Sequence, residues 1–103
     1  MDTVSDSERE IGPLLKLPAI LDLKAAAPLA AAFLARRGGD ITVDAGEVQR
    51  LGGQCLQVLL AAQMSWREDL NSMHVQAPSA DFLLALELFG VTPDHLFQEE
   101  SVA

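Results

Sequence analysis

The chain has 103 residues, of which 50% are hydrophobic, and a formal net charge of −8 from 7 basic and 15 acidic side chains. This length suits one domain with one core, and the acidity disfavours nucleic acid as a partner, which would require a basic stripe. The single cysteine excludes an intramolecular disulfide framework. Because no apolar run reaches the length of a membrane span, we expect a cytoplasmic protein with no membrane insertion.

The chain is expected to begin with a tail, a strand and an alanine-rich helix. Residues 1–11 are polar and mostly acidic, which is typical of a flexible tail. The apolar run Leu14–Leu17, just before a proline, predicts a strand. In the next helix Pro28 is tolerated only in the first turn, so we expect the helix to start near Ala26 or Ala27. Gly38–Gly39 should end it, with two arginines in its last turn.

Two further strands and a long helix are expected in the middle of the chain. Asp40–Asp44 reads as a strand because its apolar and polar residues alternate, and residues 45–51 read as a loop. A helix from about Gly53 to Asp69 follows, and Asn71–Gln76 predicts a third strand.

The last helix has clear signals at both ends. Ser79 is a favourable N-cap and Gly90 closes the helix. A buried stripe at helical spacing is expected from Phe82, Leu86 and Phe89. Thr92–Phe97 predicts a further short turn of helix, and residues 98–103 a C-terminal tail. Strands and helices that alternate in this way indicate one α/β domain over residues 12–97, with a small, mostly parallel β-sheet packed against α-helices.

The side chains that could support catalysis form no motif. His74 and His95 lack the spacing of paired metal ligands, so we interpret them as structural or surface residues. A cysteine at a helix start can be reactive, but Cys55 lies on one stripe with Val58, Leu59 and Ala62, which favours a buried position.

The acidic residues give equally little support for a metal or nucleotide site. No pair has a motif-like spacing among the candidates Asp22, Asp40, Asp44 and Glu47. The pair Gly52–Gly53 extends to neither of the glycine-rich nucleotide fingerprints, so we expect no metal, no cofactor and no enzyme activity. Two alternatives stay open: an enzyme that uses Cys55 or the Asp44/Glu47 loop, and a sensor that holds an anion at the Gly52–Gly53 notch.

The helix that begins at Gly53 has an unusual outer face. The face opposite Cys55 carries small or neutral residues and becomes charged only near its end, and it consists of Gln54, Gln57, Ala61, Met64, Ser65 and Glu68. A neutral helix face of this kind is suited to binding another protein. Trp66, near the helix end, is expected to pack against the edge of the core rather than to anchor a partner.

Several segments taken together resemble STAS domains, the domains of anti-anti-sigma factors and sulfate-transporter tails. The similarity rests on their order and spacing across residues 12–97, and the segments are Leu17–Ala26 (LPAILDLKAA), Ile41–Val48 (ITVDAGEV), Leu51–Leu60 (LGGQCLQVLL), Phe82–Gly90 and Leu96–Phe97. The resemblance implies a STAS-like α/β fold and a role in protein–protein interaction without catalysis.

The resemblance also identifies a modified switch position. The family pattern of Asp, then Ser or Thr, a small residue, Gly and Leu falls on residues 52–56, where this chain has Gly52, Gly53, Gln54, Cys55 and Leu56. In the family the hydroxyl is phosphorylated by a partner kinase, and the phosphate blocks binding. Because Gly52 and Gly53 carry neither the acid nor the hydroxyl, they are interpreted as a degenerate phosphosite beside a permanently open partner-binding face formed by Gly53, Gln54, Gln57, Ala61 and Met64.

The resemblance suggests three placements for such a domain. The leading one is the stand-alone STAS protein of bacterial chemotaxis gene clusters, with a histidine kinase of the signalling complex as its partner. The second is the STAS subunit that binds the ATPase of a lipid-transporting ABC system. The third is an anti-anti-sigma factor that binds an anti-sigma kinase, a role that normally requires the phosphorylatable residue.

Overall fold

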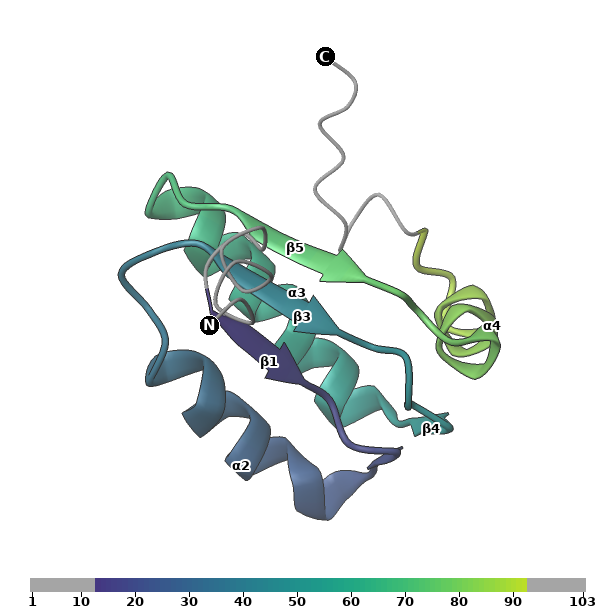
Figure 1. The fold of residues 1–103 in the computed structure, drawn as a ribbon. Helices are drawn as coiled ribbons and strands as arrows, with labels where there is room; N and C mark the ends of the chain where they lie inside the picture. The colour runs from purple at the N-terminus through teal and green to yellow at the C-terminus, as the bar shows by residue number, and fades with distance from the viewer. Residues whose placement is uncertain (1–12, 93–103) are drawn as a thin grey trace, which may run out of the picture.

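A computed structural model describes residues 13–92 of the protein. Its main sheet contains three parallel strands in the order β1 (Leu14–Lys16), β3 (Ile41–Asp44) and β5 (Met73–Gln76). A second, two-stranded parallel sheet pairs β2 (Ile20–Leu21) with β4 (Arg50–Leu51). The expected parallel α/β domain is therefore confirmed, with its strands in chain order across the main sheet (Figure 1).

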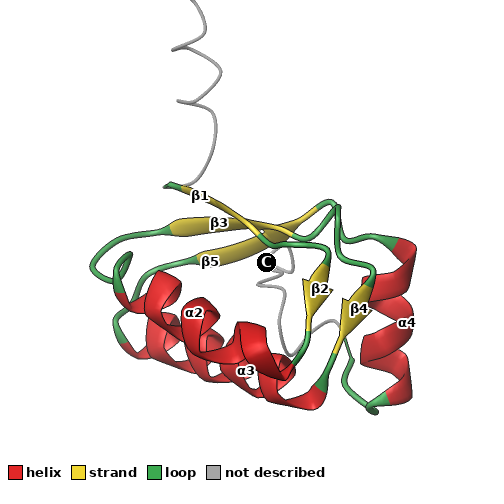
Figure 2. Ribbon diagram, turned by 90° about the horizontal axis from the view of Figure 1, so that it is seen from below, coloured by secondary structure: helices red, strands yellow, loops and turns green. Residues whose placement is uncertain are grey.

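Three helices complete the described part of the fold: α2 (Leu23–Leu34), α3 (Gly53–Glu68) and α4 (Ala80–Leu88). Figure 2 shows α2 and α3 side by side on one face of the main sheet, while α4 stands at the end of the molecule next to β4. This arrangement places the starts of α2 and α3 together, beyond the carboxyl ends of the main strands.

The core fills the space between the main sheet and this helix pair. Alternate strand residues point into it, including Leu15, Ile41, Val43, Met73 and Val75, all of which are buried. Strand alternation puts successive side chains on opposite faces, so His74 lies on the other side of the sheet from α2 and α3, where it is exposed.

The start of α2 differs from the prediction. The helix begins at Leu23, earlier than the expected Ala26 or Ala27, and includes Pro28 in its interior. Asp22 is the N-cap, and its carboxylate accepts a hydrogen bond from the Lys24 N–H at 3.1 Å. Pro28 removes one hydrogen bond to the Lys24 carbonyl, but both residues are exposed, so water can satisfy that carbonyl.

The end of α2 also differs from the prediction. The helix stops at Leu34, and the chain continues through a turn in which Gly38 has φ +110°. Arg36 and Arg37 therefore lie just beyond the helix rather than in its last turn. The Arg36 guanidinium nonetheless donates to the Ala32 carbonyl at 2.8 Å, so it satisfies one of the terminal carbonyls of α2.

The strand β4 corrects the expectation of a plain loop over residues 45–51. Arg50 and Leu51 pair with Ile20 and Leu21, a second strand that was also not predicted. In α4, by contrast, the Ser79 hydroxyl accepts the Phe82 N–H at 3.0 Å, as its predicted role as N-cap requires. The predicted turn at Thr92–Phe97 and both predicted tails extend outside the described residues.

Candidate partner-binding surface on helix α3

The first turn of α3 has no side-chain cap. Gly52 is the N-cap in an extended conformation, with φ −92° and ψ 169°, and its carbonyl accepts the Leu56 N–H at 3.0 Å. Its own N–H donates to the Leu21 carbonyl at 2.9 Å, which fixes the start of α3 against β2. Among the helices of residues 13–92, α3 alone begins without a capping side chain.

Neither glycine is required by the local geometry. Gly52 and Gly53 both lack a positive φ, so a side chain would cause no backbone strain at either position. A Cβ added at Gly53 would lie 3.7 Å from the Phe89 ring, and one added at Gly52 would lie 3.4 Å from the Leu21 carbonyl. Both distances are ordinary van der Waals contacts, so a Cβ fits at both positions.

Phe89 takes part in this site instead of in the core. It was expected on the buried stripe with Phe82 and Leu86, and those two side chains are buried. Phe89 is 47% exposed and its ring lies next to Gly53. The prediction for Phe89 is wrong because Phe89 caps the C-terminal end of α4, one residue beyond the helix, where the ring reaches the start of α3.

The buried and exposed residues of α3 lie on opposite faces, as expected. Cys55, Leu59 and Ala62 are buried and Val58 is half-buried. On the opposite side the exposed residues are Gly53, Gln54, Gln57, Ala61, Met64 and Glu68, and Ser65 is half-buried. We call Gly53, Gln54, Gln57, Ala61 and Met64 the docking face. Its exposure is shown, and its role in binding a partner stays a prediction.

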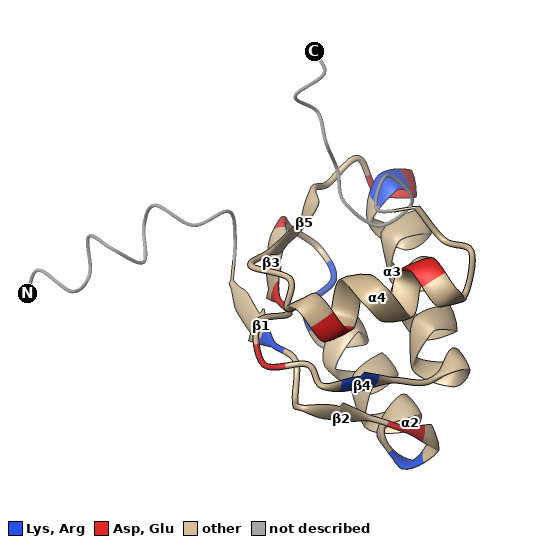
Figure 3. Cartoon of the chain, turned by 90° about the vertical axis from the view of Figure 1, so that its right-hand side faces the viewer, with Lys and Arg blue, Asp and Glu red and all other residues tan. Residues whose placement is uncertain are grey.

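The docking face carries no charge. Within α3 the charged residues are Arg67 and Glu68, both at the C-terminal end, so the helix is uncharged from Gly53 to Trp66 (Figure 3). Met64 is 58% exposed on this face. A neutral, partly apolar surface of this kind costs little to desolvate when another protein covers it.

Cys55 is a core residue at the start of α3. It is fully buried, and its Sγ donates to the Asp22 carbonyl at 3.3 Å. Burial raises the pKa of the Cys55 thiol, and the charge of Asp22 raises it further. A nucleophilic cysteine needs the opposite shift, so this geometry argues against a thiol-dependent enzyme.

Each of the carboxylates singled out in the sequence has a local structural contact. Asp22 caps α2, and Asp40 accepts the Ser72 N–H at 2.8 Å. Asp44 accepts the Gly46 N–H at 2.8 Å. Glu47 forms an ion pair of 3.0 Å with Lys16, and this contact raises the pKa of Lys16.

The described residues contain neither a cluster of side chains that could bind a metal nor a helix that could span a membrane. Across residues 13–92, no three His, Cys, Asp or Glu side chains are grouped so that they could hold a metal ion. His95 lies outside this range. The same residues contain no helix long and apolar enough to span a bilayer.

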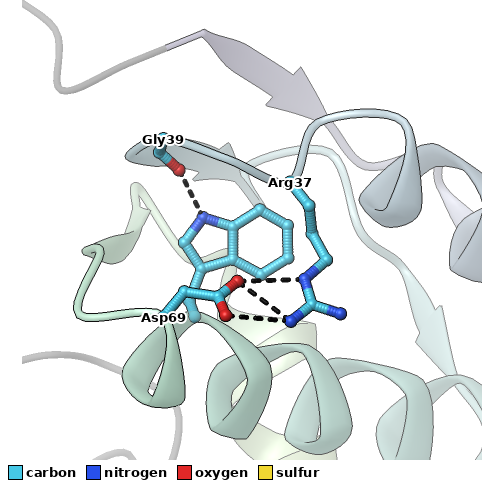
Figure 4. Close-up of polar contacts among 4 residues, drawn as sticks. Arg37, Gly39 and Asp69 are labelled. Carbon is cyan, nitrogen blue, oxygen red and sulfur yellow. Dashed lines mark hydrogen bonds and ion pairs between the residues drawn. The ribbon is translucent and has the colours of Figure 1, made fainter.

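The C-terminal end of α3 is held by side-chain contacts (Figure 4). Trp66 is buried, its indole N–H donates to the Gly39 carbonyl at 2.7 Å, and its ring meets that of Phe33 edge-on at 5.9 Å. The Arg37 guanidinium donates to both carboxylate oxygens of Asp69 at 3.0 Å. Trp66 was expected to pack against the edge of the core, and the structure places it in a buried position near the end of α3.

Comparison with known proteins identifies the family. No curated protein and no solved structure matched the chain. One family model, described as "Mlab, STAS domain", matches residues 4–97, which is most of the chain. Domains of this kind generally regulate other proteins by binding them. The chain belongs to the STAS domain family.

Proposed function

We propose that this protein is a non-catalytic regulator that binds a signalling partner through the docking face of α3. The observation that carries the proposal is the uncharged, exposed surface from Gly53 to Met64, which begins beside the half-exposed ring of Phe89. Phenylalanine is among the residues enriched at the core of protein–protein interfaces. Phe89 therefore extends the docking face at its N-terminal end.

We further propose that Gly52 and Gly53 are a degenerate phosphosite. A phosphate at this point would place about two negative charges beside the neutral docking face, which would oppose the approach of a partner. Gly53 offers no hydroxyl to carry it, and no Ser or Thr occurs between Val43 and Met64. The docking face would then stay open, and regulation would depend on the supply of the partner.

The proposed partner is a histidine kinase of a chemotaxis system, in the cytoplasm. The alternative partner is the ATPase of a lipid-transporting ABC system, and an anti-sigma kinase is the third candidate. All three proposals use the same surface of α3, so they are distinguished by which purified partner binds.

The first test places a positive charge in the middle of the docking face. Gln57→Arg should weaken binding to the kinase about tenfold or more, because an arginine there must be desolvated at the centre of the interface. Ala61→Arg should act in the same way. His74→Arg is the matched control, because it adds the same side chain at an exposed position on the opposite side of the sheet.

Affinity is measured by calorimetry, and folding is checked by thermal unfolding. Equal affinity for Gln57→Arg, Ala61→Arg and the control would exclude this face as the binding surface. Binding to the ABC ATPase but not to the kinase would select the alternative partner.

A second test examines the former switch position directly. Gly53→Asp should weaken binding because a carboxylate supplies part of a phosphate's charge. Aspartate in the first turn also stabilises a helix by about 0.3–1 kcal/mol, so weaker binding would not reflect unfolding. Gly53→Ala is the matched control, since a Cβ fits at 3.7 Å from Phe89. If both variants bind like the parent protein, Gly53 does not contact the partner.

A further inference from the structure

A small hollow lies between α2 and α3, on the part of their surface nearest the C-terminal end of α3. Its volume is about 220 Å³. The walls are formed mainly by apolar side chains, among them Ala30, Phe33, Val58 and Trp66. Alanines on both helices leave this space open, because larger side chains at the same positions would fill it.

The polar groups of the hollow are Arg37 and Ser65. The Arg37 guanidinium uses Nε and Nη2 to hold Asp69, with N···O distances of 2.9–3.0 Å. Within residues 13–92 its third nitrogen, Nη1, makes no hydrogen bond, and Figure 4 shows it on the side of the guanidinium that points away from Asp69. Arg37 therefore lines an apolar cavity with a guanidinium that is held on one side by Asp69.

The fixed position of Arg37 matters for binding. A free arginine side chain loses rotamer entropy when it captures a ligand, but the two-point contact with Asp69 has already oriented this one. The same contact neutralises much of its charge, so an acceptor group bound at Nη1 gains mainly a directional, charge-assisted hydrogen bond. The expected affinity is consequently modest.

The size of the hollow limits its occupant. Sites for drug-sized ligands usually measure roughly 300–1,000 Å³, and this one is smaller. A short hydrocarbon chain or a single ring fills it, with one acceptor group at the Arg37 end. We propose that the hollow is a binding site for a small monocarboxylate with an apolar body, such as a short- to medium-chain fatty acid, whose carboxylate binds Arg37 Nη1 while its chain packs against Phe33, Val58 and Trp66. Ala61 lines the hollow and also belongs to the docking face, so the two surfaces adjoin each other.

Trp66 gives the test a direct optical signal. It is the single tryptophan, and the chain contains no tyrosine, so the intrinsic emission of the protein reports the wall of the hollow. Octanoate added to the full-length protein should change the Trp66 emission with a saturable, millimolar dependence. The amide signals of residues 30–37 and 58–66 should shift in NMR spectra over the same range of octanoate.

Two substitutions test the two halves of the site. Ala30→Leu should abolish the octanoate response by filling the hollow, whereas Ala31→Leu, an exposed neighbour outside it, should not. Arg37→Gln should weaken the response about tenfold, as expected for the loss of a hydrogen bond to a charged group. Arg36→Gln is its control, because Arg36 does not line the hollow.

Other results would overturn the proposal. Octylamine carries the same chain with the opposite charge, and an equal response to it would show that the carboxylate is not recognised. The absence of any saturable response to octanoate would exclude the site. If octanoate gives no response in the parent protein and Ala30→Leu loses kinase binding, the proposal is also excluded. In that case the hollow would receive a side chain of the partner.

Discussion

The two ends of α3 are built in opposite ways. At the C-terminal end Trp66 and Asp69 connect the helix to the turn after α2 through an indole hydrogen bond and a two-point ion pair. At the N-terminal end there is no side-chain cap: Cys55 is buried and bonded to the Asp22 carbonyl, while the outer side of the first turn carries only Gly53 and Gln54 beside the half-exposed ring of Phe89. We expect the C-terminal end of α3 to contribute mainly to stability, and the proposed function assigns partner binding to the exposed face of the N-terminal half.

Separate substitutions should therefore affect separate properties. Changes at the C-terminal end of α3 should lower the free energy of unfolding, and changes at the N-terminal end should lower partner affinity. A variant that moved both quantities together would weaken this division.

The largest effect is expected from Trp66→Ala. Removing a buried aromatic side chain costs about 3–5 kcal/mol, and here the Gly39 carbonyl also loses its donor. Urea unfolding followed by circular dichroism should show this loss. Met64→Ala, at a 58% exposed position of the same helix, is the control and should change the unfolding free energy by less than about 0.5 kcal/mol.

The next effect concerns binding at the other end. Phe89→Ala should weaken partner affinity about tenfold, a loss of roughly 1–2 kcal/mol, while thermal unfolding changes little because the ring is half-exposed. Leu88→Ala removes an exposed apolar neighbour outside the Gly53 contact and serves as the control. A large drop in stability with unchanged affinity would make Phe89 a core residue after all.

A pH dependence should follow from Cys55. Its pKa is raised in the folded protein, so above the unfolded thiol value of about 8.5 the unfolded chain releases its proton first. The unfolding free energy should then fall as pH rises through the window between the unfolded and folded pKa values. Denaturant unfolding between neutral and alkaline pH measures this slope, and Cys55→Ala should remove it. A slope that survives in that variant would belong to another group.

The smallest effect is expected at the ion pair. Asp69→Asn should lower the unfolding free energy by about 0.2–1 kcal/mol, because both partners are substantially solvated. Added salt should reduce the difference between this variant and the parent protein. Glu68→Gln is the control, since Glu68 is an exposed neighbour for which no ion pair is found in residues 13–92. Equal losses in both variants would show a general charge effect.

The sequence predicted the elements with strong local signals. The three strands of the main sheet, the long helix α3 and the N-cap at Ser79 were all found near the expected places. The buried stripe through Cys55 and the position of Trp66 were also confirmed, because helical spacing alone determines which α3 residues share a face.

The missed features depend on contacts between distant residues. The strands β2 and β4 have two residues each, and the Ile20–Arg50 pairing joins residues thirty positions apart, which no local pattern reveals. Pro28 misled the prediction for α2 because the helix holds this proline in its interior, where the Lys24 carbonyl that loses its donor is exposed to water. Phe89 matches the helical stripe in spacing, but it lies beyond the end of α4, where the spacing no longer determines its direction.

The geometry of Gly52 and Gly53 has an evolutionary consequence. Because a Cβ fits at both positions without backbone strain, the backbone of the fold does not require these glycines. Glycine codons that end in a pyrimidine differ by a single nucleotide from codons for aspartate and for serine. From such codons, two point mutations would produce an Asp–Ser pair at the start of α3.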